Sequence, residues 1–137
     1  MTCTFFGNRD VTAEIYEPLQ RSIIQLIEKE AVVEFYVGNH GKFDKMVYEI
    51  LRELQPVYHF KFSVVLAYLN QNEYPPCHTL YPEGIEKVPP RLAIVWRNEW
   101  MIERADYVVT YTKDTTGGAG MMKELARKKK KRIIELA

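Results

Sequence analysis

Short apolar runs that end beside a glycine and lead into a helical pattern recur along this chain. Residues 3–6 form one run, which stops at Gly7, and residues 32–37 form another, which stops at Gly38. A third run at 106–111 leads into a glycine-rich turn and then into a helical pattern. Because continuous apolar strands are covered on both faces, this rhythm predicts a parallel sheet with helices on both sides and right-handed crossovers.

The rest of the chain fits the same alternation. Pro18 is expected to start the regular part of the first helix, and Pro56 to end the second. We therefore expect an α/β fold, a Rossmann-like three-layer αβα arrangement with a five-stranded, mainly parallel sheet, in a single domain over residues 1–137. The remaining expected strands are 62–68 and 132–136, and the expected helices are 15–27, 43–54, 91–104 and 122–126.

The net charge and the cysteines exclude several classes of protein. With 19 Lys and Arg against 18 Asp and Glu, the formal net charge is +1, so no general field attracts nucleic acid or an anionic membrane. Cys3 and Cys77 lie far apart and suggest no disulfide framework, which favours a reducing compartment. No apolar stretch approaches the roughly 18 residues of a bilayer-spanning helix, and the N-terminus lacks a signal pattern. We expect a cytoplasmic chain without a membrane partner.

The connection over residues 69–90 is rich in proline, which blocks regular structure. Connections longer than about 12 to 15 residues in a compact domain are typically functional lids or disordered segments. Tyr74 and Tyr81 stand beside prolines and can anchor the chain. We therefore expect an ordered lid here.

The glycines of residues 117–120 stand where a strand turns into a helix. Such a turn can hold an anion, since glycine lets the backbone approach a ligand and a helix N-terminus offers N–H groups and a positive dipole end. A tight turn without a ligand fits the same glycines about equally well. The pattern is neither G-x-G-x-x-G nor a P-loop, which argues against a conventional NAD dehydrogenase or NTPase. Thr115 and Thr116 can donate to a phosphate or cap the helix.

Two charged side chains near the expected strand ends are candidate ligand contacts. Arg9, close to Gly7, can hold a phosphate through two N–H groups, or it can pair with Asp10 on the surface. Asp44, in the first turn of its helix, can hold a ribose hydroxyl or interact with the helix dipole. The sequence leaves both choices open.

Glu124 is the sharpest catalytic candidate. It follows Gly120 by one turn, and helical side chains lean toward the N-terminus, so its carboxylate can reach a ligand in the glycine turn. Arg97 and Asn98 on the preceding helix can meet it, and they share a face with Ile94 and Met101. A structural ion pair between Glu124 and Arg97 is the alternative.

The histidines and the basic run suggest less specific roles. His40, His59 and His78 have no metal-ligand spacing among themselves or with the cysteines, so we expect no metal. The basic run at 127–132 invites a nucleic-acid interpretation, but a solvated helix C-terminus is the preferred one.

Five stretches, in order along nearly the whole chain, match the pattern of a known family. They are Phe-Phe-Gly-Asn-Arg-Asp at 5–10, Phe-Tyr-Val-Gly-Asn-His-Gly-Lys-Phe-Asp at 35–44, Tyr-Pro-Glu-Gly at 81–84, Trp-Arg-Asn-Glu-Trp-Met-Ile at 96–102, and Gly-Gly-Ala with Lys-Glu-Leu-Ala within 117–126. These stretches resemble the YpsA-like branch of the SLOG superfamily. That superfamily includes the LOG cytokinin-activating phosphoribohydrolases and the DprA single-strand DNA binders. The resemblance implies a Rossmann-like fold that binds nucleotides or nucleotide-derived ligands.

LOG enzymes carry Pro-Gly-Gly-x-Gly-Thr-x-x-Glu, with the glutamate and an arginine of the preceding helix as catalytic residues. By this resemblance Glu124 and Arg97 take those roles, and the glycines of 117–120 match the motif. Thr116 stands in place of the proline, and Met121 in place of the phosphate-binding threonine. These two departures favour binding over turnover. Asn8 stands where the YpsA-like pattern commonly has histidine.

The leading hypothesis is a protein that binds a small-molecule nucleotide ligand, an adenine nucleotide or ADP-ribose derivative, to sense or sequester a signal made from NAD. The pyrophosphate would lie against the glycine turns with help from Arg9, Asp44 would hold a ribose, and the lid would cover a base. No further cofactor is required. LOG-like N-glycosidic hydrolysis of a nucleotide is the alternative, and single-stranded nucleic-acid binding is a weaker one. A homo-oligomer stays open.

The predicted ligand-binding residues come from the three glycine turns, from the starts of the helices that follow two of them, from the end of the strand at 62–68 and from the helix at 91–104. They are Gly7, Asn8, Arg9, Gly38, Asn39, Gly41, Asp44, Tyr68, Arg97, Asn98, Thr115, Thr116, Gly117, Gly118, Ala119, Gly120 and Glu124.

Overall fold

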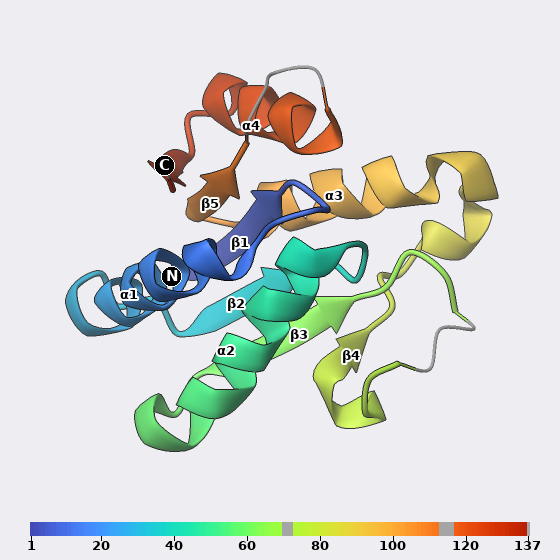
Figure 1. The fold of residues 1–137 in the computed structure, drawn as a ribbon. Coiled ribbons are helices and arrows are strands. Elements are labelled where there is room, and N and C mark those ends of the chain that lie inside the picture. The colour runs from blue at the N-terminus through green and yellow to red at the C-terminus, as the bar shows by residue number, and fades with distance from the viewer. Residues whose placement is uncertain (70–72, 113–116, 137) are drawn as a thin grey trace.

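A six-stranded parallel sheet forms the centre of the molecule (Figure 1). The computed structural model describes residues 1–69, 73–112 and 117–136. The sheet has the order β4-β3-β2-β1-β5-β6, and every neighbouring pair is parallel. Its strands are β1 (Thr2–Gly7), β2 (Glu34–Val37), β3 (Lys61–Val65), β4 (Thr79–Leu80), β5 (Tyr107–Tyr111) and β6 (Arg132–Glu135).

The expectation of five strands was wrong by one strand. β4 has two residues, Thr79 and Leu80, which pair with Val64 and Val65 of β3. It lies inside the proline-rich connection, where two residues are too few to produce a periodic signal in the sequence. The α/β, Rossmann-like fold class itself is confirmed, and the sheet is parallel throughout the described residues.

The strand order reverses between β1 and β5. The chain adds β2, β3 and β4 on one side of β1 and then returns to place β5 and β6 on the other side. At such a switch point the loops that leave the two central strands turn away from each other and open a crevice at the carboxyl edge of the sheet. This topology fixes where a ligand site is expected.

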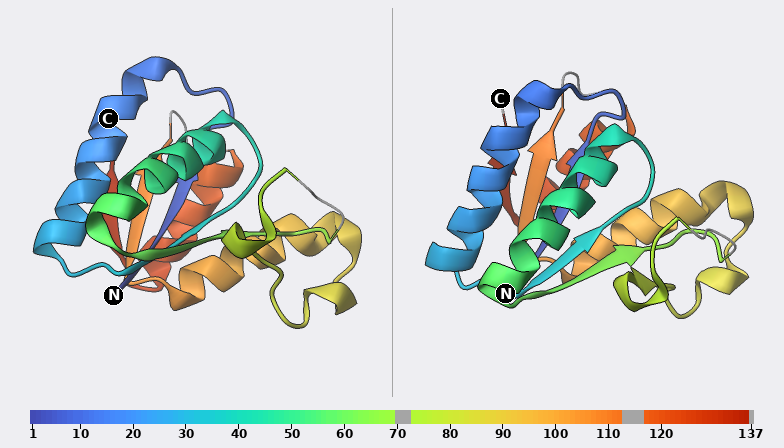
Figure 2. Two further views of the ribbon diagram at one scale, coloured as in Figure 1. Left: turned by 90° about the horizontal axis from the view of Figure 1, so that it is seen from below. Right: turned by 60° about the horizontal axis from the view of Figure 1, so that its bottom comes forward.

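Two pairs of helices cover the sheet, one pair on each face, as Figures 1 and 2 show. Phe5 packs into the core beneath α1 and α2, while its neighbour Phe6 packs against α3 and α4 on the other face. Successive strand residues point to opposite faces, so burial of both explains why β1 is apolar without alternation. The helices are α1 (Tyr16–Lys29), α2 (Lys42–Tyr58), α3 (Ala93–Arg104) and α4 (Gly118–Lys128).

The prediction that Pro56 ends its helix was wrong. Pro56 lies within the last turn of α2, which continues to Tyr58. The His59 N–H donates to the Gln55 carbonyl at 2.9 Å and closes that turn. A proline lacks only its own N–H, so the bond that ends this helix does not depend on it.

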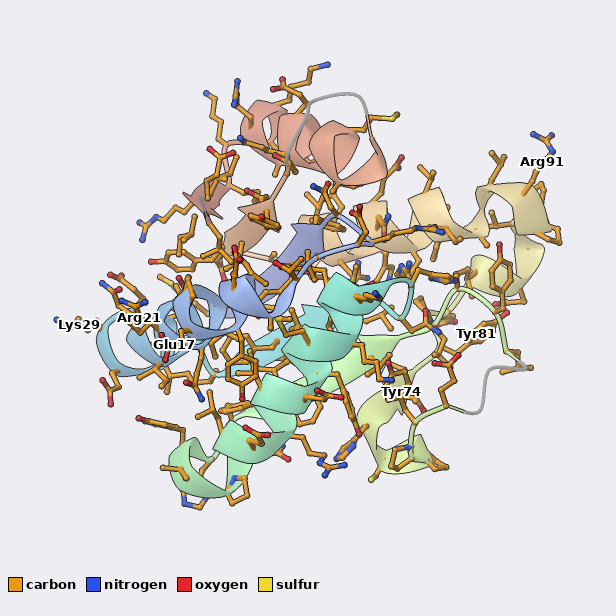
Figure 3. All side chains as sticks on the ribbon, viewed as in Figure 1. Glu17, Arg21, Lys29, Tyr74, Tyr81 and Arg91 are labelled. Atoms are coloured by element: carbon orange, nitrogen blue, oxygen red, sulfur yellow. The ribbon has the colours of Figure 1, made fainter. Side chains whose placement is uncertain are left out.

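The connection between β3 and α3 contains short elements and tyrosine anchors. Tyr74 packs against Tyr48 of α2, with ring centroids 4.4 Å apart, and Tyr81 packs against the same core cluster; Figure 3 labels both tyrosines. Figure 2 shows this segment projecting past β3 at one end of the molecule.

Within the described residues, no helix is both long and apolar enough to cross a bilayer. The 3-10 helices of the chain are η1 (Ala13–Ile15), η2 (Pro76–His78), η3 (Ile85–Lys87) and η4 (Pro90–Leu92).

Candidate functional site

A cleft of about 430 Å³ opens at the carboxyl edge of the sheet, at the switch point. The prediction that the three glycine turns converge at this edge is confirmed, because all three contribute to its walls. The lining residues are Phe5, Phe6, Gly7, Asn8, Arg9, Asp10, Gly38, His40, Asp44, Ile94, Arg97, Asn98, Met101, Gly117, Gly118 and Ala119.

One face of α3 forms a wall of the cleft. Ile94, Arg97, Asn98 and Met101 were expected to share a face because of their helical spacing, and all four line the cleft. Met101 is buried, and it also contacts the Thr4 hydroxyl of β1. Packing against the sheet therefore fixes α3, the helix that carries Arg97 and Asn98.

Arg97 is only 2% exposed, and several hydrogen bonds hold its guanidinium in place. Its Nη1 donates to the Val65 carbonyl at 2.9 Å and to Asn39 Oδ1 at 3.1 Å, and its Nε donates to Asn98 Oδ1 at 2.8 Å. Its Nη2 lies 3.2 Å from His40 Nδ1. Three of these bonds go to groups at the ends of β2 and β3, the fourth goes to Asn98 of α3 itself, and together they fix the guanidinium against the cleft.

The charge of Arg97 has no ionic partner within 4.0 Å among the described residues. All four hydrogen-bond acceptors of Arg97 are neutral groups. Burial lowers the pKa of its guanidinium, and the nearby Asp44 opposes that shift. Since an arginine in a protein stays protonated, the cleft wall contains a desolvated positive charge.

Asp44 and Arg97 both lie close to Gly38. A Cβ atom built on Gly38 would lie 2.8 Å from Asp44 Oδ2 and 3.1 Å from Arg97 Cζ, so only glycine leaves room for both side chains. The His40 backbone N–H donates to Asp44 Oδ2 at 3.0 Å. Burial raises the pKa of Asp44 to about 6, against the opposing effects of that bond, Arg97 and Arg9.

His40 is neutral at physiological pH. Burial, together with the charges of Arg97 and Arg9, lowers its pKa to about 4. In the neutral ring Nδ1 accepts from Arg97, so the proton is on Nε2. The ring also meets Tyr68 edge-on at 6.3 Å.

The turn after β2 positions Arg9. Gly41 has φ +99°, a conformation that favours glycine, and a Cβ there would come within 2.9 Å of the Arg9 Cα. The Lys42 N–H at the start of α2 donates to the Arg9 carbonyl at 2.8 Å. The exposed Arg9 side chain thereby stays beside the cleft.

The N-terminus of α4 forms the wall opposite α2. Gly117 is the N-cap residue, and Gly118 and Ala119 begin the helix and line the cleft. The positive end of the helix dipole therefore faces the same space as Arg97 and Arg9. Thr115 and Thr116, which were expected to add hydroxyl groups, lie outside the described residues.

Glu124 does not line the cleft. It lies on the exposed side of α4, where it pairs with Arg127 at 3.2 Å, and its side chain is 48% exposed. The sequence placed it one turn after the glycines but could not give the rotation of α4 about its axis. Asp44 takes the place beside Arg97 that the sequence interpretation gave to Glu124.

Four other predicted residues lie behind or beside the cleft. Asn39 supports Arg97 from behind, and the Tyr68 hydroxyl donates to the Pro90 carbonyl at 2.8 Å. Gly41 supports Arg9, and Gly120 is buried in α4. The predicted residues that do line the cleft are Gly7, Asn8, Arg9, Gly38, Asp44, Arg97, Asn98, Gly117, Gly118 and Ala119.

His40 and Asp10 line the cleft but were missing from the predicted ligand set. Both follow a strand and its glycine closely, so their distance from the strand end was an available signal. The described part of the 69–90 connection adds no residue to the cleft wall. Its tyrosines face α2 and the core instead.

The basic run lies at the opposite edge of the sheet. Lys129 pairs with Glu103, Lys131 donates to the Glu103 carbonyl, and Arg132 donates to the Tyr107 hydroxyl. A hollow of about 230 Å³ beside them is separate from the cleft. Among the described residues, no group of three or more His, Cys, Asp or Glu gathers as a metal site.

No protein-family model matches the chain, and no curated protein matches it either.

Proposed function

We propose that the cleft binds a nucleotide-derived anion of the ADP-ribose or NAD-derived class and that the protein senses or sequesters this ligand. The observation that carries the proposal is the buried Arg97, which lines the cleft without a carboxylate partner within ion-pair distance among the described residues. A desolvated charge is costly unless it is compensated. Asp44 lies beyond ion-pair distance and offsets the charge only in part, so a ligand anion in direct contact with Arg97 would add to that compensation.

The size and position of the cleft support this class of ligand. Its volume of about 430 Å³ falls within the range of about 300 to 1,000 Å³ that is typical of small-molecule sites. It lies at the switch point, where ligands of open parallel sheets bind. Two arginines and a helix N-terminus suit a diphosphate, and the resemblance to the YpsA-like branch of the SLOG superfamily agrees with a nucleotide.

Hydrolysis of an N-glycosidic bond is the second candidate, favoured by the position of Arg97 alone. The LOG-like mechanism also needs Glu124, which pairs with Arg127 on the exposed side of α4. We therefore rank binding first. Nucleic-acid binding is ranked last, since the basic run is distant from the cleft and engaged in surface bonds.

Titration calorimetry with ADP-ribose tests the proposal. Arg97→Lys is expected to weaken binding at least about tenfold, because lysine cannot reproduce the planar set of bonds. Arg104→Lys makes the same change on the exposed end of α3 and should stay within about twofold. Arg9→Gln removes an exposed cleft charge without disturbing the core and should also weaken binding.

Two further measurements separate binding from turnover. Mass spectrometry of small molecules released on denaturation should identify a ligand that co-purifies unchanged. Glu124→Gln should bind ADP-ribose like the wild type; release of free base by the wild type, lost in this variant, would favour hydrolysis. Failure of a panel of adenine nucleotides and ADP-ribose derivatives to bind would refute the proposal.

A further inference from the structure

Asp44 of α2 and Arg97 of α3 both approach the space beside Gly38 in the cleft. A Cβ atom built on Gly38 would lie 2.8 Å from Asp44 Oδ2 and 3.2 Å from Arg97 Nη1. Asp44 Oδ2 and Arg97 Nη1 are therefore no more than about 6 Å apart, a distance at which each charge affects the other. They form no ion pair within 4.0 Å. The carboxylate is thus close enough to offset the guanidinium charge without occupying its hydrogen-bonding groups.

Asp44 faces charged or polar groups from every element around it. Arg97 approaches from α3 and Arg9 from the turn after β1, and both favour its ionised form. The His40 backbone N–H, in the turn after β2, favours that form as well. Tyr74 of the connection also interacts with it, and burial raises the pKa of this tyrosine to about 12, so its phenol stays neutral. Burial of Asp44 is the opposing effect.

We propose that Asp44 takes up one proton when an anion binds against Arg97, so that ligand binding is coupled to protonation of this carboxylate. The inference rests on the proposed function of the cleft. The proton comes from solvent and forms an O–H bond on Asp44, which removes the negative charge of the carboxylate from beside the bound anion. The resulting carboxylic acid donates a hydrogen bond, which suits a phosphate, diphosphate or sulfate oxygen.

The free cleft is poised for this exchange. With a pKa of about 6, Asp44 is mostly ionised at neutral pH in the free protein. An anion at Arg97 cancels one of the charges that favour ionisation and adds a negative charge nearby, so the pKa rises further. His40 is the other candidate acceptor, but a proton on its Nδ1 would break the bond from Arg97. Asp44 therefore accepts the proton.

The coupling gives the affinity a defined pH dependence. Between the Asp44 pKa values of the free and bound protein, uptake of one proton makes the association constant rise about tenfold for each unit that the pH falls. Below about pH 6, where Asp44 of the free protein is already protonated, the affinity should level off.

Calorimetry with two probes, sulfate and ADP-ribose, tests the coupling. Neither anionic group titrates between about pH 5.5 and about pH 8, so any proton that is taken up on binding is bound by a group of the protein. Titrations in buffers with different ionisation heats count the protons taken up at each pH. The wild type should take up close to one proton at neutral pH. Asp44→Asn should take up none, lose the pH dependence, and bind both anions several-fold tighter at pH 8.

Asp10→Asn and His40→Asn are the matched controls. Asp10 is an exposed carboxylate in the same cleft, and His40 is the competing proton acceptor. Both variants should keep the proton uptake and the pH dependence. If either control lost the proton uptake on anion binding while Asp44→Asn kept it, the proposal would be overturned.

The two probes separate failure of this inference from failure of the proposed function. Proton-coupled sulfate binding without ADP-ribose binding would support the coupling and refute the nucleotide ligand. ADP-ribose binding with no proton uptake would overturn the coupling and leave the ligand class intact. If Asp44→Asn weakens ADP-ribose binding but leaves sulfate unaffected, Asp44 holds a ribose hydroxyl and the coupling is wrong. Absence of binding by both anions refutes both.

Discussion

At the scale of single residues, Gly38 determines whether the charged pair can form. Its missing Cβ leaves a space that both the Asp44 carboxylate and the Arg97 guanidinium approach. Arg97 cannot retreat, because four hydrogen bonds hold it, and Asp44 is tied to the His40 backbone. The glycine is therefore part of the site, although it offers no side chain to a ligand.

Gly38→Ala should damage both stability and binding. The new methyl group would lie 2.8 Å from Asp44 Oδ2, so the carboxylate or the guanidinium must move. We expect a loss of about 1 to 3 kcal/mol in the free energy of unfolding, as for other overpacked sites, and at least about tenfold weaker ADP-ribose binding. Urea unfolding and calorimetry measure the two effects.

Gly118→Ala is the control for that substitution. Gly118 lies at the start of α4, and a Cβ built there meets nothing within 4 Å. Its unfolding free energy should be unchanged or slightly higher, since alanine favours a helix. Equal stability of Gly38→Ala and the wild type would show that the space above Gly38 is not constrained.

At the scale of the elements, three helices end at a non-glycine residue in the left-handed conformation. Ala31, His59 and Lys130 follow α1, α2 and α4 with φ between 57° and 59°. The α4 end shows the hydrogen bond that accompanies such a residue, in which the Lys131 N–H donates to the Ala126 carbonyl, five residues earlier, at 3.0 Å. Each of these residues bears the strain that glycine would avoid.

Ala31→Gly should therefore stabilise the protein. Ala31 is exposed, so the change relieves its φ of +57° and removes no buried contact. We expect a gain of about 0.5 to 1 kcal/mol in the free energy of unfolding, less than the strain because glycine is also freer in the unfolded chain. Ala105→Gly, at the end of α3 with φ −86° and 1% exposure, should destabilise instead. A loss of stability in Ala31→Gly would contradict the argument.

These helix ends also show what the sequence could not predict. Without a glycine at 31, 59 or 130, the apolar period gave the helices but not where they stop. The i, i+3, i+4, i+7 spacing from residue 94 to residue 101 correctly predicted that Arg97 and Asn98 share a face with Ile94 and Met101, because helical geometry alone sets it. The position of Glu124 depends on how α4 rotates against the sheet, which tertiary packing decides and a local pattern does not contain.

At the scale of the whole molecule, the reversal of strand order brings the site together. The glycine turns come from distant parts of the sequence, yet the parallel sheet places every strand end at one edge. The apolar runs were enough to predict this convergence. The proximity of Asp44 to Arg97 was not predictable, because it depends on the distance between α2 and α3 across the turn after β2.

The separation of the two edges gives the molecule two chemically different ends. Arg9, Arg97 and the start of α4 line the cleft at the carboxyl edge, while the basic run lies at the amino edge, where its side chains bind protein groups. The carboxyl edge therefore offers cationic groups to a ligand, while several basic side chains of the amino edge are engaged with the protein itself.

A crystal structure of the chain grown with ADP-ribose tests the central claim most directly. We predict that the diphosphate lies in the cleft, within hydrogen-bonding distance of Arg97 or Arg9 and beside the first residues of α4. Ligand density at the basic edge near Lys129–Arg132, or a cleft left empty at saturating ADP-ribose, would contradict the account.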